Sequence, residues 1–411
     1  MNYREQILAT LNHKEPEHVA IDLGSTSSSS ISAIAYSNLI NYLDLPVKQN
    51  LVYDVVQQVT QPDMYVLDLF KVGVVDIGRA FNTEKTDWHD VTLSNGETAQ
   101  YPKWFHPELQ ADGNYFAFNE NRECLARMPV GATFFDQMLF PYIDNYPDNF
   151  KELPKDMEKV LWAAFPPSPF DHINEPDFWQ RLREKAIYLR ENSGRAVMIA
   201  AGCNLFEWGT YLRRMDNFLM DIAVEPEQVE KFLDALMEIH LATLDKICTA
   251  VGDVVDIVRL CDDLGTDTGP FMHPDTYRRI FKPRHKILCD YIKKHSNMKV
   301  FIHSCGSIYK LMPDLIEAGF EIFNPVQTVC RDMDAARLKK EFGKDVVFWG
   351  GGCDTRTVLN HGTPEQVREH VKRNIEIFAP GGGFVFNTVH NIMPDVPPEN
   401  ILAMFETVNQ Y

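Results

Sequence analysis

The second half of the chain alternates between short apolar runs and longer amphipathic stretches. Apolar runs of four to eight residues bounded by Gly, Pro or polar residues are typical of buried strands, and amphipathic stretches of ten or more are typical of helices. Eight runs fit the strand pattern: 19–24, 72–78, 196–201, 254–260, 299–305, 320–325, 346–350 and 384–388. The helical stretches are 2–13, 176–192, 226–250, 274–295, 307–318, 333–341, 363–378 and a last one from 398. Thr363, Pro364 and Gln366 form a helix-start signal, an N-cap followed by Pro and then by Gln three residues after the cap.

Strands that alternate with helices imply βα units and a parallel sheet. Eight such units predict an α/β fold, a single (β/α)₈ TIM barrel that covers residues 1–411. Residues 79–195 break the regular alternation and are predicted to form an insertion subdomain at the barrel mouth. This insertion should contain a hairpin about Asn95-Gly96 and the helix 176–192. Its many aromatic residues either pack that subdomain against the core or form an apolar lid over a site.

Composition limits the classes of function. The chain has 411 residues and a formal net charge of −18, with no basic run to offset it. This argues against nucleic acid or an anionic membrane as a partner. The N-terminus has no apolar signal region and no apolar run reaches the length of a membrane span. Eight cysteines in such a chain are expected to be reduced thiols, some of them metal ligands, in a cytoplasmic protein.

The strand 299–305 ends in His303-x-Cys305. Side chains alternate along a strand, so these two residues point the same way and can bind one metal. Cys353 follows another predicted strand and is the expected third ligand; Glu207, Asp262 and His390 are the alternatives. Three N/S ligands leave the fourth tetrahedral position open, as in catalytic zinc sites. The competing interpretations are that the cysteines are small core residues, or that Cys330 or Cys261 closes the shell of a stabilising zinc.

Further polar residues are expected at the same face, because sites in such barrels lie at the C-terminal ends of the strands. Four are candidate catalytic groups: Asp262, Asp263, Glu207 and His390. Four are candidate cofactor-binding groups: Asp22, Asn324, Gln327 and Asn387. Each has a structural alternative, for example Asp262 and Asp263 capping a turn, or Glu207 pairing with Arg213 or Arg214.

Several motifs resemble the uroporphyrinogen decarboxylase-like superfamily, and the resemblance extends over nearly the whole chain. They are Arg4-Glu5 with Leu11-Asn12-His13-Lys14-Glu15-Pro16, Asp262-Asp263-Leu264-Gly265, Phe301-Ile302-His303-Ser304-Cys305-Gly306-Ser307, Asn324-Pro325-Val326-Gln327, Trp349-Gly350-Gly351-Gly352, and Ala379-Pro380-Gly381-Gly382-Gly383 with Asp395-Val396-Pro397-Pro398-Glu399-Asn400. The superfamily is one of (β/α)₈ barrels and includes zinc- and corrinoid-dependent methyltransferases. Decarboxylases of this type bind their polycarboxylate substrate with an Arg-rich loop after the first strand. Here that loop is Ser25–Ser32, and no Arg lies between Arg4 and Arg79.

The resemblance therefore implies the methyltransferase branch, in which His-x-Cys and a distant Cys hold zinc. The expected function is transfer of a methyl group between a small methylated substrate and the cobalt of a separate corrinoid protein, because the chain lacks an Asp-x-His-x-x-Gly cobalamin motif. The aromatic insertion favours O-demethylation of an aromatic methyl ether. The alternatives are a methylcobalamin:thiol methyltransferase, a uroporphyrinogen-type decarboxylase and a non-catalytic zinc-binding barrel. The sequence leaves the oligomeric state open, with a homodimer as the candidate assembly.

Overall fold

The structure, a computed structural model, describes residues 1–46 and 49–411. Eight parallel strands form one sheet in the order β1-β17-β16-β15-β14-β13-β12-β5. Their bounds are β1 Ala20–Ile21, β5 Val74–Asp76, β12 Ala196–Gly202, β13 Ile257–Cys261, β14 Lys299–His303, β15 Ile322–Asn324, β16 Val347–Trp349 and β17 Phe384–Phe386. The N–H of Gly73 donates to the carbonyl of Ile21 (2.8 Å), which joins the two edge strands. The predicted barrel with strands in sequential order is confirmed.

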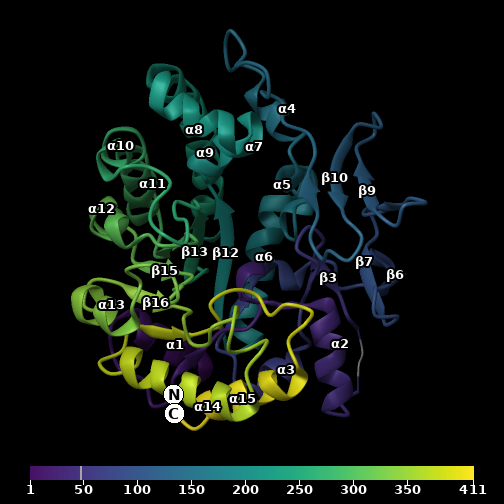
Figure 1. Cartoon of the computed structure of the whole chain (residues 1–411), viewed down its shortest axis with the longest axis vertical. Helices are drawn as coiled ribbons and strands as arrows, with labels where there is room; N and C mark the ends of the chain where they lie inside the picture. The colour runs from purple at the N-terminus through teal and green to yellow at the C-terminus, as the bar shows by residue number, and fades with distance from the viewer. Residues whose placement is uncertain (47–48) are drawn as a thin grey trace.

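Helices surround this sheet, and both chain ends lie together at its lower end in Figure 1. Their bounds are α1 Tyr3–Leu11, α2 Ala33–Tyr42, α3 Met64–Leu69, α6 Phe178–Asn192, α7 Phe206–Arg213, α8 Met215–Val224, α9 Pro226–Val251, α10 Pro274–Ile280, α11 Lys282–His295, α12 Met312–Ala318, α13 Ala335–Phe342, α14 Pro364–Phe378 and α15 Pro398–Val408. The predicted capping box forms at the start of α14, where Thr363 accepts from the N–H of Gln366. Among the residues described, no helix has the length and apolar character to cross a membrane.

The barrel interior is apolar at the N-terminal ends of the strands, which form the lower end of the barrel in Figure 1. On each strand, alternate residues point inward, and those inward residues form one buried cluster that includes Val74, Ile257, Phe301 and Trp349. Ile7 of α1 belongs to the same cluster, so this helix seals the lower end. Outward residues such as Val258 pack instead against the surrounding helices. Because the interior below is filled, polar chemistry is confined to the C-terminal ends of the strands.

The small strands lie outside the barrel, on one side of the molecule (Figure 1). β6 (Trp88–Thr92) and β7 (Thr98–Pro102) pair as a hairpin. The remaining short strands are β8 Glu108–Leu109, β9 Tyr115–Phe118, β10 Cys124–Met128 and β11 Asp136–Gln137 in a four-stranded antiparallel sheet, and β2 Ile31–Ser32, β3 Val52–Asp54 and β4 Val59–Thr60 in a three-stranded one. We propose, as the sequence indicated, that 79–195 is an insertion within a single barrel domain. Three α-helices of this segment are α4 Leu153–Met157, α5 Leu161–Ala164 and α6 Phe178–Asn192.

The aromatic residues of the insertion pack mainly on one another. Phe105 and Phe135 are buried in a second apolar cluster, to which Val52 and Ala33 from the segment before β5 also contribute. A cavity of about 430 Å³ lies beside this cluster, lined by residues such as Tyr101, but by none of His303, Cys305 and His390. The structure therefore favours the packing interpretation of these aromatics over the lid.

Candidate metal centre at the barrel mouth

A layer of polar side chains lies directly above the apolar interior. Two residues beyond the inward Phe301, His303 points inward at the end of β14. The strand register sets His303 beside Cys261 on one neighbouring strand and beside Asn324 on the other. Inward-facing groups from different strands therefore meet at one level of the barrel.

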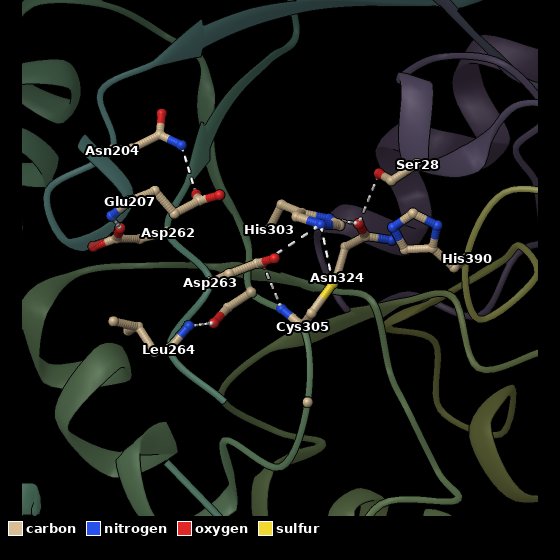
Figure 2. A network of polar contacts seen from close by, with 12 residues as sticks. Ser28, Asn204, Glu207, Asp262, Asp263, Leu264, His303, Cys305, Asn324 and His390 are labelled. Atoms are coloured by element: carbon tan, nitrogen blue, oxygen red, sulfur yellow. Dashed lines mark hydrogen bonds and ion pairs between the residues drawn. The ribbon is translucent and has the colours of Figure 1, made fainter. Parts of the chain in front are cut away.

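Three metal-ligating side chains come together here. One potential ligand atom from each of His303, Cys305 and His390 lies within 4.8 Å of the others. The Sγ of Cys305 is 3.4 Å from Nε2 of His303, and the two imidazole rings are 5.8 Å apart between centroids. Figure 2 shows the three side chains converging from the end of β14 and from the loop after β17. We call these three residues the donor cluster.

Hydrogen bonds fix the tautomer of both histidines. Nδ1 of His303 lies 2.6 Å from Oδ1 of Asn324, and the amide nitrogen of Asn324 donates to the carbonyl of Trp349 (2.8 Å). The amide orientation is thereby set, so Nδ1 of His303 carries the proton and Nε2 keeps a free lone pair. His390 repeats the arrangement, with Nδ1 2.9 Å from Oδ1 of Asn391. Polar partners that orient metal-ligating histidines in this way are characteristic of metal sites.

Two carboxylates border the donor cluster. Oδ1 of Asp263 accepts the backbone N–H of Cys305 (2.8 Å) and lies 3.7 Å from Nε2 of His303. Glu207, at the start of α7, accepts hydrogen bonds from the hydroxyl of Tyr211 (2.5 Å) and from the amide of Asn204 (2.6 Å). Tyr211 in turn packs against Trp162 and accepts at its carbonyl from the amide of Gln137 (2.6 Å), and both residues belong to the insertion.

The environment keeps these groups electrically neutral in the absence of a cation. Burial, and then the charge of Arg259, lower the pKa of His303 well below its usual value. Burial also lowers the pKa of His390. Burial, with the nearby carboxylates of Asp263 and Glu207, raises the pKa of the Cys305 thiol. For Glu207 itself, burial and the neighbouring acidic groups raise the pKa to about 8.

The donor set fits zinc. Imidazole nitrogen and thiolate sulfur are ligands that suit this ion. Zn–S and Zn–N bonds of about 2.3 and 2.0 Å at a tetrahedral angle place the two ligand atoms about 3.5 Å apart, close to the 3.4 Å between Cys305 and His303. Two neutral imidazoles and one thiolate would leave a bound Zn²⁺ with a net positive charge and an open fourth position.

Cys353 is not part of the donor cluster. It is fully buried within the main hydrophobic core, and its thiol lies 3.9 Å from the carbonyl oxygen of Asp354. Three glycines separate it from the end of β16, and Gly350 and Gly351 adopt positive φ angles (108° and 76°). Because these turns interrupt the alternation of the strand, the position of Cys353 at a strand end does not direct its side chain into the barrel. His390, one of the alternatives considered from the sequence, lies with His303 and Cys305 instead.

Asp262 and Asp22, two further residues predicted from the sequence, form hydrogen bonds with other parts of the protein. Asp262 is fully buried; it accepts the N–H groups of Phe206 and Glu207 and pairs with His285 (3.2 Å), so it positions the start of α7. Asp22 accepts from Nε1 of Trp349 (2.8 Å).

Two amides complete the set of candidate cofactor-binding residues. Gln327 accepts from the N–H of Gly306, and the thiol of Cys330 lies 4.0 Å from the same oxygen of Gln327. Asn387 is buried at the end of β17. Of the four candidate cofactor-binding residues, Asn324 is the one hydrogen-bonded to a side chain of the donor cluster.

Three functional candidates were not found from the sequence: Arg79, Arg259 and Tyr53. Arg259 stands in the middle of the apolar strand Ile257-Val258-Arg259-Leu260-Cys261, at an inward-facing position. A charged residue at such a position is unusual and was the signal that could have identified it.

The structure is an α/β barrel in which three side chains capable of ligating a metal meet at the C-terminal ends of the strands. The family described as Uroporphyrinogen decarboxylase (URO-D) matches residues 170–411. This match covers more than half of the chain, and the protein belongs to that family.

Individual relatives match over shorter segments. The uroporphyrinogen decarboxylase of Chlorobium limicola is 27% identical over 192 residues, 45% of this chain and 50% of the relative. That of Pseudoalteromonas translucida is 45% identical over 51 residues, 12% of this chain and 14% of the relative. The chain thus spans half or less of these curated relatives. Among solved structures, a methyltransferase from Methanosarcina mazei aligns over 100% of this chain and 99% of its own, with a TM-score of 0.59 and 13% identity. At that identity the likeness shows the fold alone.

Proposed function

We propose that this protein is a zinc-dependent methyltransferase. Its substrate would be a small methylated compound, an aromatic methyl ether in the case we favour, and the methyl group would pass to a separate corrinoid protein. The observation that carries the proposal is the convergence of His303, Cys305 and His390 at the barrel mouth, with both imidazoles held in the tautomer that leaves Nε2 free.

In this proposal His303, Cys305 and His390 hold the zinc ion. When bound, zinc would act as a Lewis acid towards the ether oxygen, while the reduced cobalt of the corrinoid protein would supply the electron pair that takes the methyl group. The proton of the Cys305 thiol is lost on metal binding, so metal affinity should rise with pH.

Glu207 is the proposed proton donor. Its pKa is raised to about 8 by burial and by Asp263 and Asp262, so it carries a proton at neutral pH. Cleavage of the methyl–oxygen bond leaves the electron pair on oxygen, and a proton from Glu207 would convert that oxygen to a hydroxyl. Tyr211 and Asn204 orient the carboxyl group for this transfer.

Metal content tests the site first. We expect zinc in the purified wild-type protein, and loss of most of it in Cys305→Ser and in His390→Ala. Cys353→Ser is the matched control, because it removes a thiol that lies outside the donor cluster. Zinc lost in Cys353→Ser but kept in His390→Ala would contradict this ligand set.

Activity is tested next, with the zinc-loaded protein. A reduced corrinoid protein is mixed with methoxylated aromatics, and in parallel methylcobalamin is mixed with thiols and uroporphyrinogen is supplied alone. We expect the absorbance of the methylated corrinoid to appear only with the aromatics. Demethylation of methylcobalamin by thiols alone, or release of CO₂ from uroporphyrinogen, would replace the proposed reaction with one of its alternatives.

A further inference from the structure

Among the described residues, three side chains at the barrel mouth carry buried hydrogen-bond donors that make no hydrogen bond. The donors are Nε and Nη2 of Arg79, Nε of Arg259 and the hydroxyl of Tyr53. Neither arginine makes a hydrogen bond or an ion pair with any described residue. Tyr53 is 7% exposed. Buried polar groups in folded proteins are almost always paired, so an unpaired group calls for a partner from outside the chain, such as water, an ion or a ligand. We call these three residues the cation cluster.

Arg195 shows what full pairing of a buried arginine looks like in this protein. Arg195 is 2% exposed, and its guanidinium donates to the carbonyls of Val72 and Ser193 and to the carboxylate of Asp68. The chain therefore pairs a structural arginine completely where the arginine serves only the fold. Arg79 and Arg259 differ from Arg195 because their side chains have neither a hydrogen bond nor an ion pair among the described residues.

The strand register places the cation cluster in the mouth. Arg259 lies two residues before Cys261, which pairs with His303, so its side chain enters the barrel on the same face as the donor cluster. Asp76 ends β5 at an inward position, and Arg79 follows it in a 3₁₀ turn, Ile77–Ala80. Tyr53 comes from β3.

Electrostatics show that these groups are neighbours. Burial raises the pKa of Asp76 to about 7, while the N–H of Gly78 and the charges of Arg79 and Arg259 oppose that rise. Burial lowers the pKa of Arg79 to about 10, opposed by Asp76 and Tyr53. Arg259 is also the second cause of the lowered pKa of His303. Its charge therefore acts on both the cation cluster and the donor cluster.

Charge is not balanced within the cation cluster. Two guanidinium groups face one carboxylate, Asp76, whose Oδ1 is already engaged by the N–H of Gly78 at 2.6 Å. Asp54, the next residue to Tyr53, uses its carboxylate on the N–H groups of Val56 and Gln57 and on the side chain of Gln57. An oxyanion with two acceptor oxygens would match both the unpaired donors and the excess positive charge.

We propose that Arg79, Arg259 and Tyr53 bind the carboxylate of the substrate, which makes the substrate a methoxylated aromatic acid. The inference deepens the proposed function and rests on it: the carboxylate lies at the cation cluster and the methoxy group points toward the donor cluster. Arginine suits this task because its planar fork of donors matches the two oxygens of a carboxylate.

The experiment measures binding, so it does not depend on turnover. The probes are 3-methoxybenzoate and its neutral counterpart 3-methoxybenzyl alcohol, titrated by calorimetry into the zinc-loaded full chain. We expect the acid to bind at least about tenfold more tightly, since one charge-assisted pair contributes at least about 1.4 kcal/mol. Arg259→Met and Arg79→Met should each weaken the acid about tenfold or more and leave the alcohol unchanged.

Two control variants test whether binding of the acid depends on the cation cluster alone. Arg183→Met removes a surface arginine paired with Asp253, and should leave the affinity for the acid unchanged. Cys305→Ser, which lacks metal in the proposed function, should still bind the acid, because the carboxylate does not need zinc. Loss of acid binding in Cys305→Ser would mean that the carboxylate binds the metal, and would overturn the proposal.

Thermal unfolding of the free proteins gives a second readout. Replacing an unpaired buried charge by an apolar side chain of similar length should leave the unfolding midpoint unchanged or raise it. A lowered midpoint in Arg259→Met and Arg79→Met would show structural pairing and overturn the proposal, as would equal affinity for acid and alcohol. Uroporphyrinogen, which also carries carboxylates, is titrated alongside; tighter arginine-dependent binding of uroporphyrinogen than of the acid would overturn the assigned substrate class.

Discussion

The donor cluster and the cation cluster occupy one barrel mouth and differ in how the protein satisfies them. Each histidine of the donor cluster has its Nδ1 paired with an amide oxygen, and Cys305 has its N–H held by Asp263. In the cation cluster, Arg79, Arg259 and Tyr53 have buried donors that make no hydrogen bond with the part of the chain that the structure describes.

The difference separates two ways of preparing a site. A hydrogen bond from the protein orients a ligand atom before anything binds, which suits a metal whose geometry is strict. A donor left unpaired costs stability in the free protein, and that cost is recovered when an anion binds. The donor cluster should therefore respond to mutation by losing stability and metal together, whereas the cation cluster should lose ligand affinity without losing stability.

The largest effect is expected from Asn324→Leu. Asn324 is 1% exposed, orients His303 and donates to the carbonyl of Trp349. Its removal leaves two buried groups unpaired, which should cost about 1–3 kcal/mol of unfolding free energy. Loss of the histidine's orienting partner should weaken zinc binding about 10–100-fold.

Denaturant unfolding and a zinc-competition titration measure the two effects of Asn324→Leu. Ser28→Ala is the control, because the hydroxyl of Ser28 reaches Asn324 only at 3.4 Å. Unchanged zinc affinity in Asn324→Leu would contradict the prediction that Asn324 orients His303 for metal binding.

Asp262→Asn should reduce stability and leave the zinc content unchanged. The carboxylate of Asp262 binds the two N–H groups that start α7 and the ring of His285. Hydrogen bonds to a charged group contribute about 1.5–3 kcal/mol, and the amide keeps only part of this. Unfolding and elemental analysis are measured side by side; loss of zinc without loss of stability would place Asp262 in the site after all.

The sequence was sufficient for the barrel because the signal is local. Each barrel strand is an apolar run with a turn residue at its end, and the alternation of strands and helices decides the topology. The same rule identified His303 and Cys305, since residues two apart on one strand end share a face. It also indicated His390 as an alternative ligand without choosing it.

The third ligand and the cation cluster depend on contacts between residues far apart in the sequence, which no local pattern shows. The choice between Cys353 and His390 depended on positive φ angles at Gly350 and Gly351, which turn the chain after β16. The cation cluster combines residues from β3, from the turn after β5 and from β13, far apart in the sequence. The sequence interpretation considered arginine only in the loop after the first strand, where there is none, whereas Arg259 lies on β13 and Arg79 in the turn after β5.

Glu207, which borders the donor cluster, should make the free energy of unfolding depend on pH. Its folded pKa, about 8, lies above the usual value of 4.5, so between these values the folded protein holds a proton that the unfolded chain has released. Stability of the metal-free protein should therefore fall as pH rises from about 4.5 to 8. Glu207→Gln, which does not titrate, should show a flatter profile, measured by urea unfolding at several pH values. Parallel profiles for the two proteins would contradict the raised pKa.

The smallest and most discriminating effect comes from removing one hydroxyl group in each of two tyrosines. Tyr53 and Tyr101 are both 7% exposed, but the hydroxyl of Tyr101 donates to Oε1 of Gln58 at 2.6 Å, whereas that of Tyr53 lies near Ser27 and makes no hydrogen bond of 3.5 Å or less among the described residues. Tyr101→Phe should lower the free energy of unfolding by about 1 kcal/mol, the usual net contribution of a hydrogen bond. Tyr53→Phe should lose nothing or gain slightly, because an unpaired buried hydroxyl is itself a cost, while its affinity for 3-methoxybenzoate should fall by a few fold. If urea unfolding shows the two variants to be equally destabilised, the hydroxyl of Tyr53 is paired in the free protein. The contrast between a paired donor cluster and an unpaired cation cluster would then fail at Tyr53.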